Sequence, residues 1–136
     1  MYRKLSNIDF KSFIGQKVTE VNTEKNVPLG MSFETAGLII ECPWRLQVAN
    51  EIAIGYSDCL QSPKRYSHKD VKKVLIGKRI MNIVHFEDIA DLIIEFEGGI
   101  SLELFHDSNY FEGWQLLGQG DNGFCLVSLP GGSYTY

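Results

Sequence analysis

The stretch Asp91–His106 constrains the fold most, because it has the residue pattern of a β-hairpin. Apolar and polar residues alternate on both sides of the Gly98-Gly99 pair. Glycine accepts the positive φ that a tight turn needs. A loop from Glu97 to Gly99 pairs Phe96 with Ile100 and keeps the apolar residues on one face. The sequence therefore predicts two antiparallel strands with this register.

A similar pattern occurs earlier in the chain, which predicts an internal repeat. Residues 13–18 and 37–42 both match, by residue class, the stretches that lie 62 positions later. Phe33 matches Phe96 only at an offset of 63, which predicts a longer first hairpin loop, Glu34 to Gly37. At the offset of 62, Trp114 corresponds to Ile52. The alternative interpretation is that two antiparallel hairpins resemble each other by chance.

The two repeats, approximately 6–58 and 67–129, predict a mostly β fold of the α+β class in a single domain, 1–136. Each repeat is expected to hold one short helix, begun by Ser6 or Ser67, and then about four strands. The units would form a curved antiparallel sheet, a sandwich or a partly open barrel. The expected strands are 16–21, 29–33, 38–46 and 51–56 in the first repeat, and 79–86, 91–96, 100–106, 113–117 and 124–129 in the second. Pro43 is expected to mark an edge or a bulge.

Cysteine usage and hydropathy indicate a reducing compartment. Cys42, Cys59 and Cys125 are odd in number, widely spaced and form no C-x-x-C motif. The N-terminus has no apolar segment of the signal-peptide kind. No run approaches the roughly 20 apolar residues of a membrane-spanning helix. We therefore expect a cytoplasmic protein that does not bind membranes.

Charge is distributed unevenly along the chain. Residues 1–75 hold 11 Lys and Arg against 8 Asp and Glu, whereas residues 76–136 hold 2 against 9, so the net charges are +3 and −7. Carboxylates gathered near the ends of the central hairpin would attract a cationic partner, although a solvated surface is the alternative interpretation. Tyr110 joins this group because tyrosine is a favoured interface anchor. The residues predicted to contact a partner are Glu87, Asp88, Asp91, Asp107, Tyr110 and Asp121.

The sequence predicts no catalytic residue, no metal site and no cofactor. The three histidines, His68, His85 and His106, lie far apart and lack the spacing of zinc ligands. An acid–base pair at His85 or His106 has no accompanying nucleophile motif. Residues 118–123 spell G-x-G-x-x-G but precede no expected helix. The basic stretch 64–73 lacks a stacking aromatic motif, so we expect a solvated helix face and no nucleic-acid binding.

Several segments together resemble a group of small bacterial immunity proteins. They are LIIECPWRL at 38–46, IGYSD at 54–58, LIGK at 75–78, DLIIEFEGG at 91–99 and EGW at 112–114. The chain is similar over most of residues 29–117 to the immunity proteins of polymorphic, wall-associated or contact-dependent toxin systems and to their uncharacterised relatives. The resemblance implies a non-enzymatic protein that binds and blocks a cognate toxin domain, and it supplies no catalytic residues.

The acidic half agrees with this implication, because a toxin domain that acts on nucleic acid is usually basic. A self-associating structural or scaffold module is the alternative function. Ile39 and Ile93 are expected to point outward from their strands, and outward apolar residues favour association of two copies. The chain is therefore expected to be a monomer or a homodimer.

Overall fold

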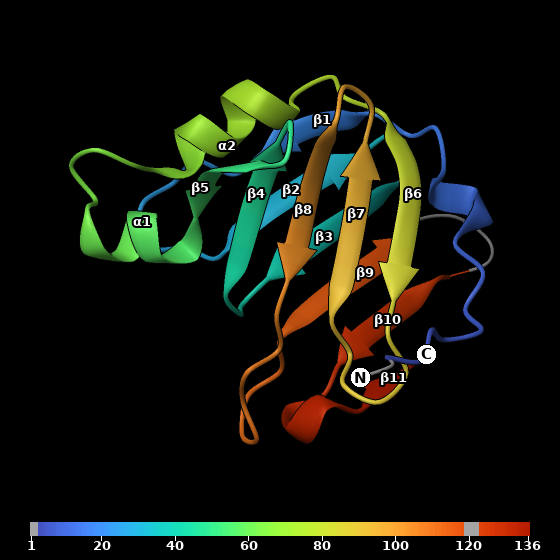
Figure 1. Cartoon of the computed structure of the whole chain (residues 1–136). Helices are drawn as coiled ribbons and strands as arrows, with labels where there is room; N and C mark the ends of the chain where they lie inside the picture. Colours follow the sequence, from blue (N-terminus) through green and yellow to red (C-terminus); the bar gives the residue numbers. More distant parts are fainter. Residues whose placement is uncertain (1–2, 119–122) are drawn as a thin grey trace.

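The computed structural model describes residues 3–118 and 123–136, and within them eleven strands form two antiparallel sheets that face each other (Figure 1). Of the three predicted arrangements, the structure therefore has the two-sheet one. The six-stranded sheet has the order β1 (Val18–Val21), β2 (Leu29–Phe33), β3 (Ala36–Ile40), β9 (Trp114–Gly118), β10 (Cys125–Ser128) and β11 (Tyr134–Thr135). The five-stranded sheet has the order β5 (Glu51–Gly55), β4 (Trp44–Val48), β8 (Ile100–Leu104), β7 (Leu92–Phe96) and β6 (Ile80–His85).

The central hairpin is confirmed in the predicted register. Phe96 pairs with Ile100, and the inward side chains of β7 and β8 are all buried in one hydrophobic core shared by both sheets. Gly98 and Gly99 have φ of +83° and +72°, so glycine meets a backbone requirement there. The predicted longer loop in the first hairpin is wrong. Ser32 pairs with Gly37, which leaves a two-residue loop of Glu34 and Thr35.

The prediction of a single strand over residues 38–46 is also wrong. The chain leaves β3 at Ile40, passes through Glu41–Pro43 and enters the opposite sheet as β4. Proline has no N–H for a ladder, which favours a break at this point. The chain crosses between the sheets again from β8 to β9, through the loop Phe105–Gly113. Each sheet therefore combines strands from both halves of the sequence.

The two halves make similar contacts where β1 and β6 begin. Lys17 and Arg79 form an antiparallel bridge. On its two sides the Gly15 N–H donates to the Ile80 carbonyl oxygen at 2.7 Å, and the Gly77 N–H donates to that of Val18 at 2.8 Å. The predicted match of Trp114 with Ile52 does not agree with the strand pairing. Trp114 lies opposite Ile40 in the β3–β9 pair, just as Trp44 lies opposite Leu104 in the β4–β8 pair.

One of the two predicted helices is confirmed. Helix α2 spans His68–Leu75 and is capped by Ser67, whose Oγ accepts from the Lys69 N–H at 3.3 Å. The helix predicted to begin at Ser6 is wrong. Ser6 instead hydrogen-bonds the end of β6, because its N–H donates to the His85 carbonyl oxygen at 2.9 Å. The other helical segments are the 3₁₀ turns η1 (Lys11–Phe13) and η2 (Pro130–Gly132) and the helix α1 (Tyr56–Gln61).

Helix α1 was not predicted, and it begins at Tyr56, the last residue of the expected strand 51–56. Asp58 stabilises the first turn of this helix, because its Oδ2 accepts from the Gly55 N–H at 2.8 Å. The basic stretch lies on and before α2, where Lys72 pairs with Glu20 of β1 at 2.7 Å. Within the described residues, no helix is long and apolar enough to cross a membrane.

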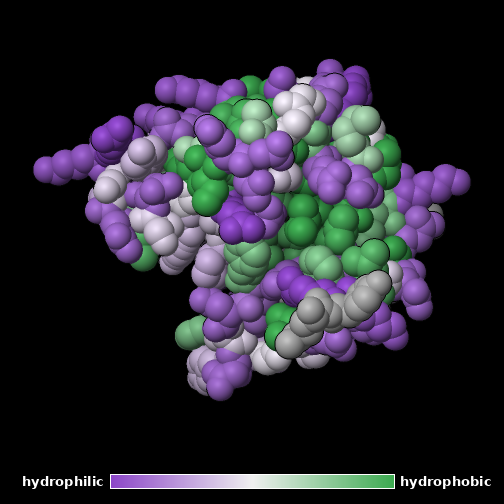
Figure 2. Space-filling model, in the orientation of Figure 1, coloured by the Kyte–Doolittle hydropathy of each residue, from purple (hydrophilic) through white to green (hydrophobic). Residues whose placement is uncertain are grey.

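The outer faces of the two sheets differ. The five-stranded sheet carries a stripe of charge along β4 and β8, where Arg45 pairs with Glu103 at 2.7 Å and Gln47 also hydrogen-bonds Glu103. Figure 2 shows this hydrophilic stripe beside an apolar area over β6 and β7. Ile93 belongs to that sheet, whereas Ile39 lies on the outer face of the other one. The two outward isoleucines therefore do not form one surface.

Candidate functional site

The loop Phe105–Gly113, between β8 and β9, carries two exposed aromatic residues, one of which is the most exposed aromatic residue of the described chain. Tyr110 is 78% exposed and Phe111 is 66% exposed. Their rings pack edge to face, with centroids 4.9 Å apart and planes at 88°. Ser108 fixes the local turn, because its Oγ accepts from the backbone N–H groups of both residues at 3.0 and 2.9 Å. The loop thus presents an ordered aromatic pair to solvent.

Carboxylates surround this aromatic pair. A hollow of about 460 Å³ lies beside the loop. The exposed residues Glu41, Asp107 and Glu112 contribute to its wall. Among the described residues that line it there is no lysine or arginine. The hollow therefore has a negative potential that favours cationic groups.

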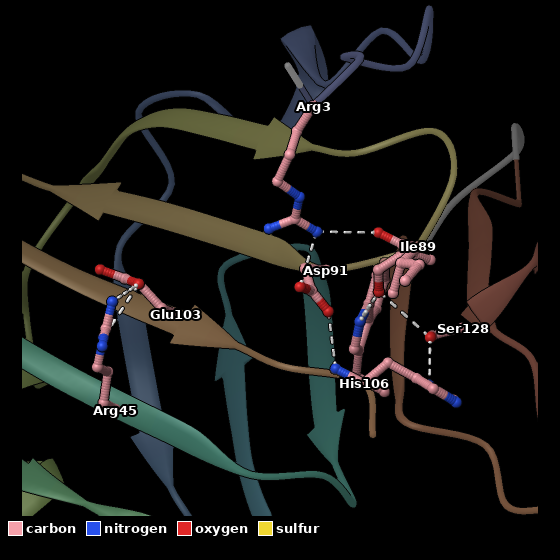
Figure 3. Close-up of polar contacts among 9 residues, drawn as sticks. Arg3, Arg45, Ile89, Asp91, Glu103, His106 and Ser128 are labelled. Carbon is pink, nitrogen blue, oxygen red and sulfur yellow. Dashed lines mark hydrogen bonds and ion pairs between the residues drawn. The ribbon is translucent and has the colours of Figure 1, made fainter. Parts of the chain in front are cut away.

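A buried polar network holds the two ends of the loop (Figure 3). The His106 N–H donates to Asp91 Oδ1 at 2.8 Å, and Arg3 pairs with Asp91 Oδ2 at 2.8 Å. The His106 ring lies between Ser108 and Ser128 of β10: its Nε2 is 2.7 Å from the Ser108 carbonyl oxygen and its Nδ1 is 2.6 Å from Ser128 Oγ. A carbonyl oxygen only accepts, so in the neutral ring Nε2 carries the proton and Nδ1 accepts from Ser128.

Trp114 and Gly113 complete this network at the start of β9. The Trp114 Nε1–H donates to the Ala90 carbonyl oxygen at 2.8 Å, which also lies 3.3 Å from Ser128 Oγ. Gly113 lies directly against the imidazole of His106, where a Cβ would overlap Nδ1. The absence of a side chain at Gly113 lets the ring occupy its site. The network therefore fixes where the loop leaves and re-enters the sheets.

The same residues include a serine, a histidine and an aspartate, but their geometry does not suit nucleophilic catalysis. Asp91 bonds the backbone of His106 and not its ring, so it cannot orient the imidazole as a triad carboxylate does. Ser128 is fully buried. Burial, with the nearby charges of Asp107 and Asp91, raises the pKa of the Cys42 thiol to about 12, which disfavours the nucleophilic thiolate. The network positions the loop and has no evident reactive group.

Metal binding has no support in the described residues, where no three His, Cys, Asp or Glu side chains gather as a metal site would need. His85, the other histidine considered for acid–base chemistry, is buried beside this network. Its Nδ1 lies 2.8 Å from Ser6 Oγ, and its ring packs edge-on against Trp114 and Tyr134. Its Nε2 is buried, and none of the described residues hydrogen-bonds it.

Burial lowers the pKa of His85 from 6.5 to about 4, although the charges of Glu87 and Asp91 oppose the shift. The unfolded chain therefore binds a proton at His85 that the folded chain does not, and stability falls as pH decreases from 6.5 to 4. We expect this residue to account for roughly 2–3 kcal/mol of that loss. Urea unfolding of the wild type and of His85→Leu across this range measures it. Parallel losses in the two proteins would contradict the assignment.

A family comparison covers nearly all of these elements. The profile of DUF6188, described as a family of unknown function, matches residues 10–136. The chain belongs to this family. No match was found among curated proteins or among solved structures. The DUF6188 match includes the loop and the residues of β7 to β10 that hold it, whereas Arg3 and Ser6 precede the matched region.

The structure brings most of the predicted contact residues of this DUF6188 chain to one end of the fold. Asp107 and Tyr110 are exposed on the β8–β9 loop. Glu87 and Asp88 lie on the β6–β7 loop, where Glu87 accepts from the Tyr134 hydroxyl at 2.9 Å and Asp88 is exposed. Asp91 is buried, at 8% exposure, beneath this surface. Asp121 lies outside the described residues.

The turn η2 connects the two loops. The Gly131 N–H donates to the Ser108 carbonyl oxygen at 2.9 Å, and the Ala90 N–H donates to that of Gly132 at 2.8 Å. Sequence reasoning did not select Glu41 or Phe111 as contacts, although both belong to the acidic and aromatic surface. Phe111 follows Tyr110 directly, so adjacent aromatics in an acidic loop were the available indication. Glu41 had none, because the crossing at Glu41–Pro43 was predicted as continuous strand.

Proposed function

We propose that this chain is a non-enzymatic binding protein that neutralises a cationic toxin domain. The observation that carries the proposal is the exposed pair Tyr110–Phe111, held in a fixed turn among carboxylates. Large aromatic side chains on a surface are costly in water and are the usual energetic centre of a protein interface. The likeness of the sequence to immunity proteins supplies the class of partner.

Local electrostatics support a cationic partner. Asp107, Glu112 and Glu41 line the hollow together with the aromatic pair, and two arginines of the fold already pair with carboxylates. Arg3 pairs with Asp91, and Arg45 pairs with Glu103. Nucleic acid would be repelled by this end of the molecule, so a basic protein surface is the better complement.

We also propose that the fold arose by internal duplication. The duplication gives a second argument that the β8–β9 loop is the binding site. Two observations support the duplication. Lys17 and Arg79 form a bridge with each other. The Lys17 N–H donates to Glu34 Oε1 at 2.8 Å, and the Arg79 N–H donates to Glu97 Oε1 at 3.1 Å. The corresponding crossings then differ in length: three residues lie between β3 and β4, but nine lie between β8 and β9. The longer crossing departs from the repeat and carries the exposed aromatics. Such a departure from a shared scaffold suits a functional insertion.

The direct test is growth rescue. A candidate toxin domain from a gene beside this one is expressed alone and together with the chain, and the two proteins are then purified from the same cells. Restored growth and co-purification are the expected results. A toxin domain that remains active and does not co-purify would contradict the proposal for that pair.

Charge reversal tests the steering role of the acidic end. We expect Asp88→Lys with Asp107→Lys to slow association with the toxin domain about tenfold or more at low salt, because these carboxylates attract a cationic surface over a distance. The difference should shrink as salt is added. Surface plasmon resonance at several salt concentrations measures it. Glu51→Lys, an exposed change on β5, is the matched control. An on-rate equal to that of the control would exclude steering by these residues.

Self-association is the second candidate function. Ile39 is 39% exposed on the outer face of the six-stranded sheet, in a strand whose neighbour β2 carries Gly30 opposite it. Ile39 and Gly30 form a small apolar area beside Gln115 of β9, and an exposed apolar area suits contact with another copy. Light scattering at several concentrations separates the candidates. A constant monomer mass supports the binding protein, and a mass that rises to that of a dimer supports self-association.

A further inference from the structure

A second hollow, of about 490 Å³, lies between α1 and the ends of β2, β3 and β4. Its size is within the range of pockets that enclose a ligand or an anchoring side chain. Leu60 and Tyr56 of α1 form one wall, and Trp44 and His68 form another. The Trp44 and His68 rings meet at 64°, with centroids 6.2 Å apart. Most of the described side chains that line the hollow are apolar or aromatic, and its polar side chains are those of Asn26, Glu41 and His68.

This hollow borders the acidic site already described. Glu41 and Cys42, on the crossing from β3 to β4, line both hollows. Among the described residues that line the second hollow, Glu41 is the one acidic residue, and His68 is the one residue with a basic side chain. Burial lowers the pKa of His68, which favours the uncharged form of its imidazole. An apolar recess therefore lies beside a strongly acidic surface, with one crossing segment between them.

Exposed apolar side chains mark the rim of the second hollow. Leu60 is 67% exposed on α1, a helix that has no fully buried residue and in which Cys59 packs against the core. Tyr56, one turn earlier, is also exposed. Leu60 alone is an ordinary surface residue, but at the rim of an apolar hollow it extends the area that a partner would cover. An apolar recess with a charged border is the usual anatomy of an interface anchor site.

We infer that this hollow receives an aromatic side chain from the cationic polypeptide segment that binds the β8–β9 loop. The inference rests on the proposed function and adds the sequence character of the partner: an aromatic residue flanked by lysine or arginine. The aromatic side chain enters between α1 and Trp44, and the flanking cations face Glu41, Asp107 and Glu112. Burial of the aromatic ring supplies affinity, and the carboxylates supply orientation.

Two synthetic five-residue peptides test the inference with the full chain. Both carry two lysines at each end, and the central residue is phenylalanine in one and alanine in the other. We expect the phenylalanine peptide to bind about tenfold more tightly, since a buried ring contributes more than a methyl group. In ¹H–¹⁵N NMR spectra it should shift the indole resonance of Trp44. The Trp114 indole is fully buried and serves as the internal control.

Two exposed positions give matched variants. Leu60→Ser should weaken binding of the phenylalanine peptide at least about threefold and leave that of the alanine peptide unchanged, because it removes apolar surface at the rim alone. Ile52→Ser, at a residue 62% exposed on β5, should change neither. Equal affinities of the two peptides, with shifts confined to the β8–β9 loop, would overturn the inference and leave the cationic site in place. Absence of shifts at both hollows would contradict the proposed function as well.

Discussion

Replacing Gly113 by alanine is expected to lower the free energy of unfolding by about 3 kcal/mol. A Cβ at this position would overlap Nδ1 of His106 and lie 3.0 Å from its Cγ. The imidazole cannot turn aside freely, because Ser108 and Ser128 contact its two nitrogens. Relief of the overlap therefore requires loss of these hydrogen bonds or movement of the crossing. Urea unfolding followed by tryptophan fluorescence measures the effect.

Gly30→Ala is the matched control, because its added Cβ would meet the Leu38 carbonyl oxygen at 3.6 Å, an ordinary contact. Its unfolding free energy should stay close to that of the wild type. Adding His106→Ala to Gly113→Ala should cost less than the sum of the two single changes, since the smaller side chain removes the overlap. Equal stability of Gly113→Ala and Gly30→Ala would show that the His106 ring is not fixed as described.

Removing both loop aromatics is expected to reduce the affinity for the toxin domain about a hundredfold, a loss typical of interface anchors. The double variant Tyr110→Ala with Phe111→Ala should unfold at nearly the same urea concentration as the wild type, because both side chains are exposed. Isothermal titration calorimetry with the purified toxin domain gives the affinity. A loss of binding without a loss of stability would place these residues in the interface.

Tyr136→Ala controls for loss of an exposed aromatic elsewhere. Tyr136 is 67% exposed and packs against Phe124, away from the residues that line the acidic hollow. Its replacement should leave the affinity unchanged. Equal weakening by Tyr136→Ala and by the double loop variant would contradict the assignment of the interface to the β8–β9 loop.

Local sequence patterns predicted the elements whose information lies within a few residues. The β7–β8 hairpin follows from period-two alternation around two glycines, and its register follows from keeping the apolar residues on one face. Helix α2 follows from the cap formed by Ser67 and Asp70 at its first turn. The Ser67 N–H donates to Asp70 Oδ2, and Ser67 Oγ accepts from the N–H of Lys69. Ser6 has the sequence context of a helix cap, but no helix begins there. The backbone N–H of Ser6 instead hydrogen-bonds the carbonyl oxygen of His85 at the end of β6, as in a strand pair.

The part of the candidate site that depends on local sequence was predicted, and the part that depends on distant residues was not. Acidic turns and a loop tyrosine are visible in sequence, which placed Asp107 and Tyr110 correctly on the exposed loop. Burial of Asp91 was not visible, because it depends on Arg3, 88 positions away, and on the backbone of His106. Glu41 joined the site through a crossing between sheets that alternation alone does not reveal. Such neighbours are set by the packing of distant strands.

The sequence by itself determined which residues are buried in the β7–β8 hairpin, where that hairpin turns, and that acidic residues concentrate in the second half. These properties depend on alternation, glycine conformation and composition, which are local. The tertiary structure decided that β4 and β9 exchange sheets, and thereby placed two crossings side by side at one end. An apolar residue gains the same burial against any complementary face, so pattern fixes that a strand is buried but not which strand covers it. The acidic loop and the apolar hollow beside it exist because of that pairing.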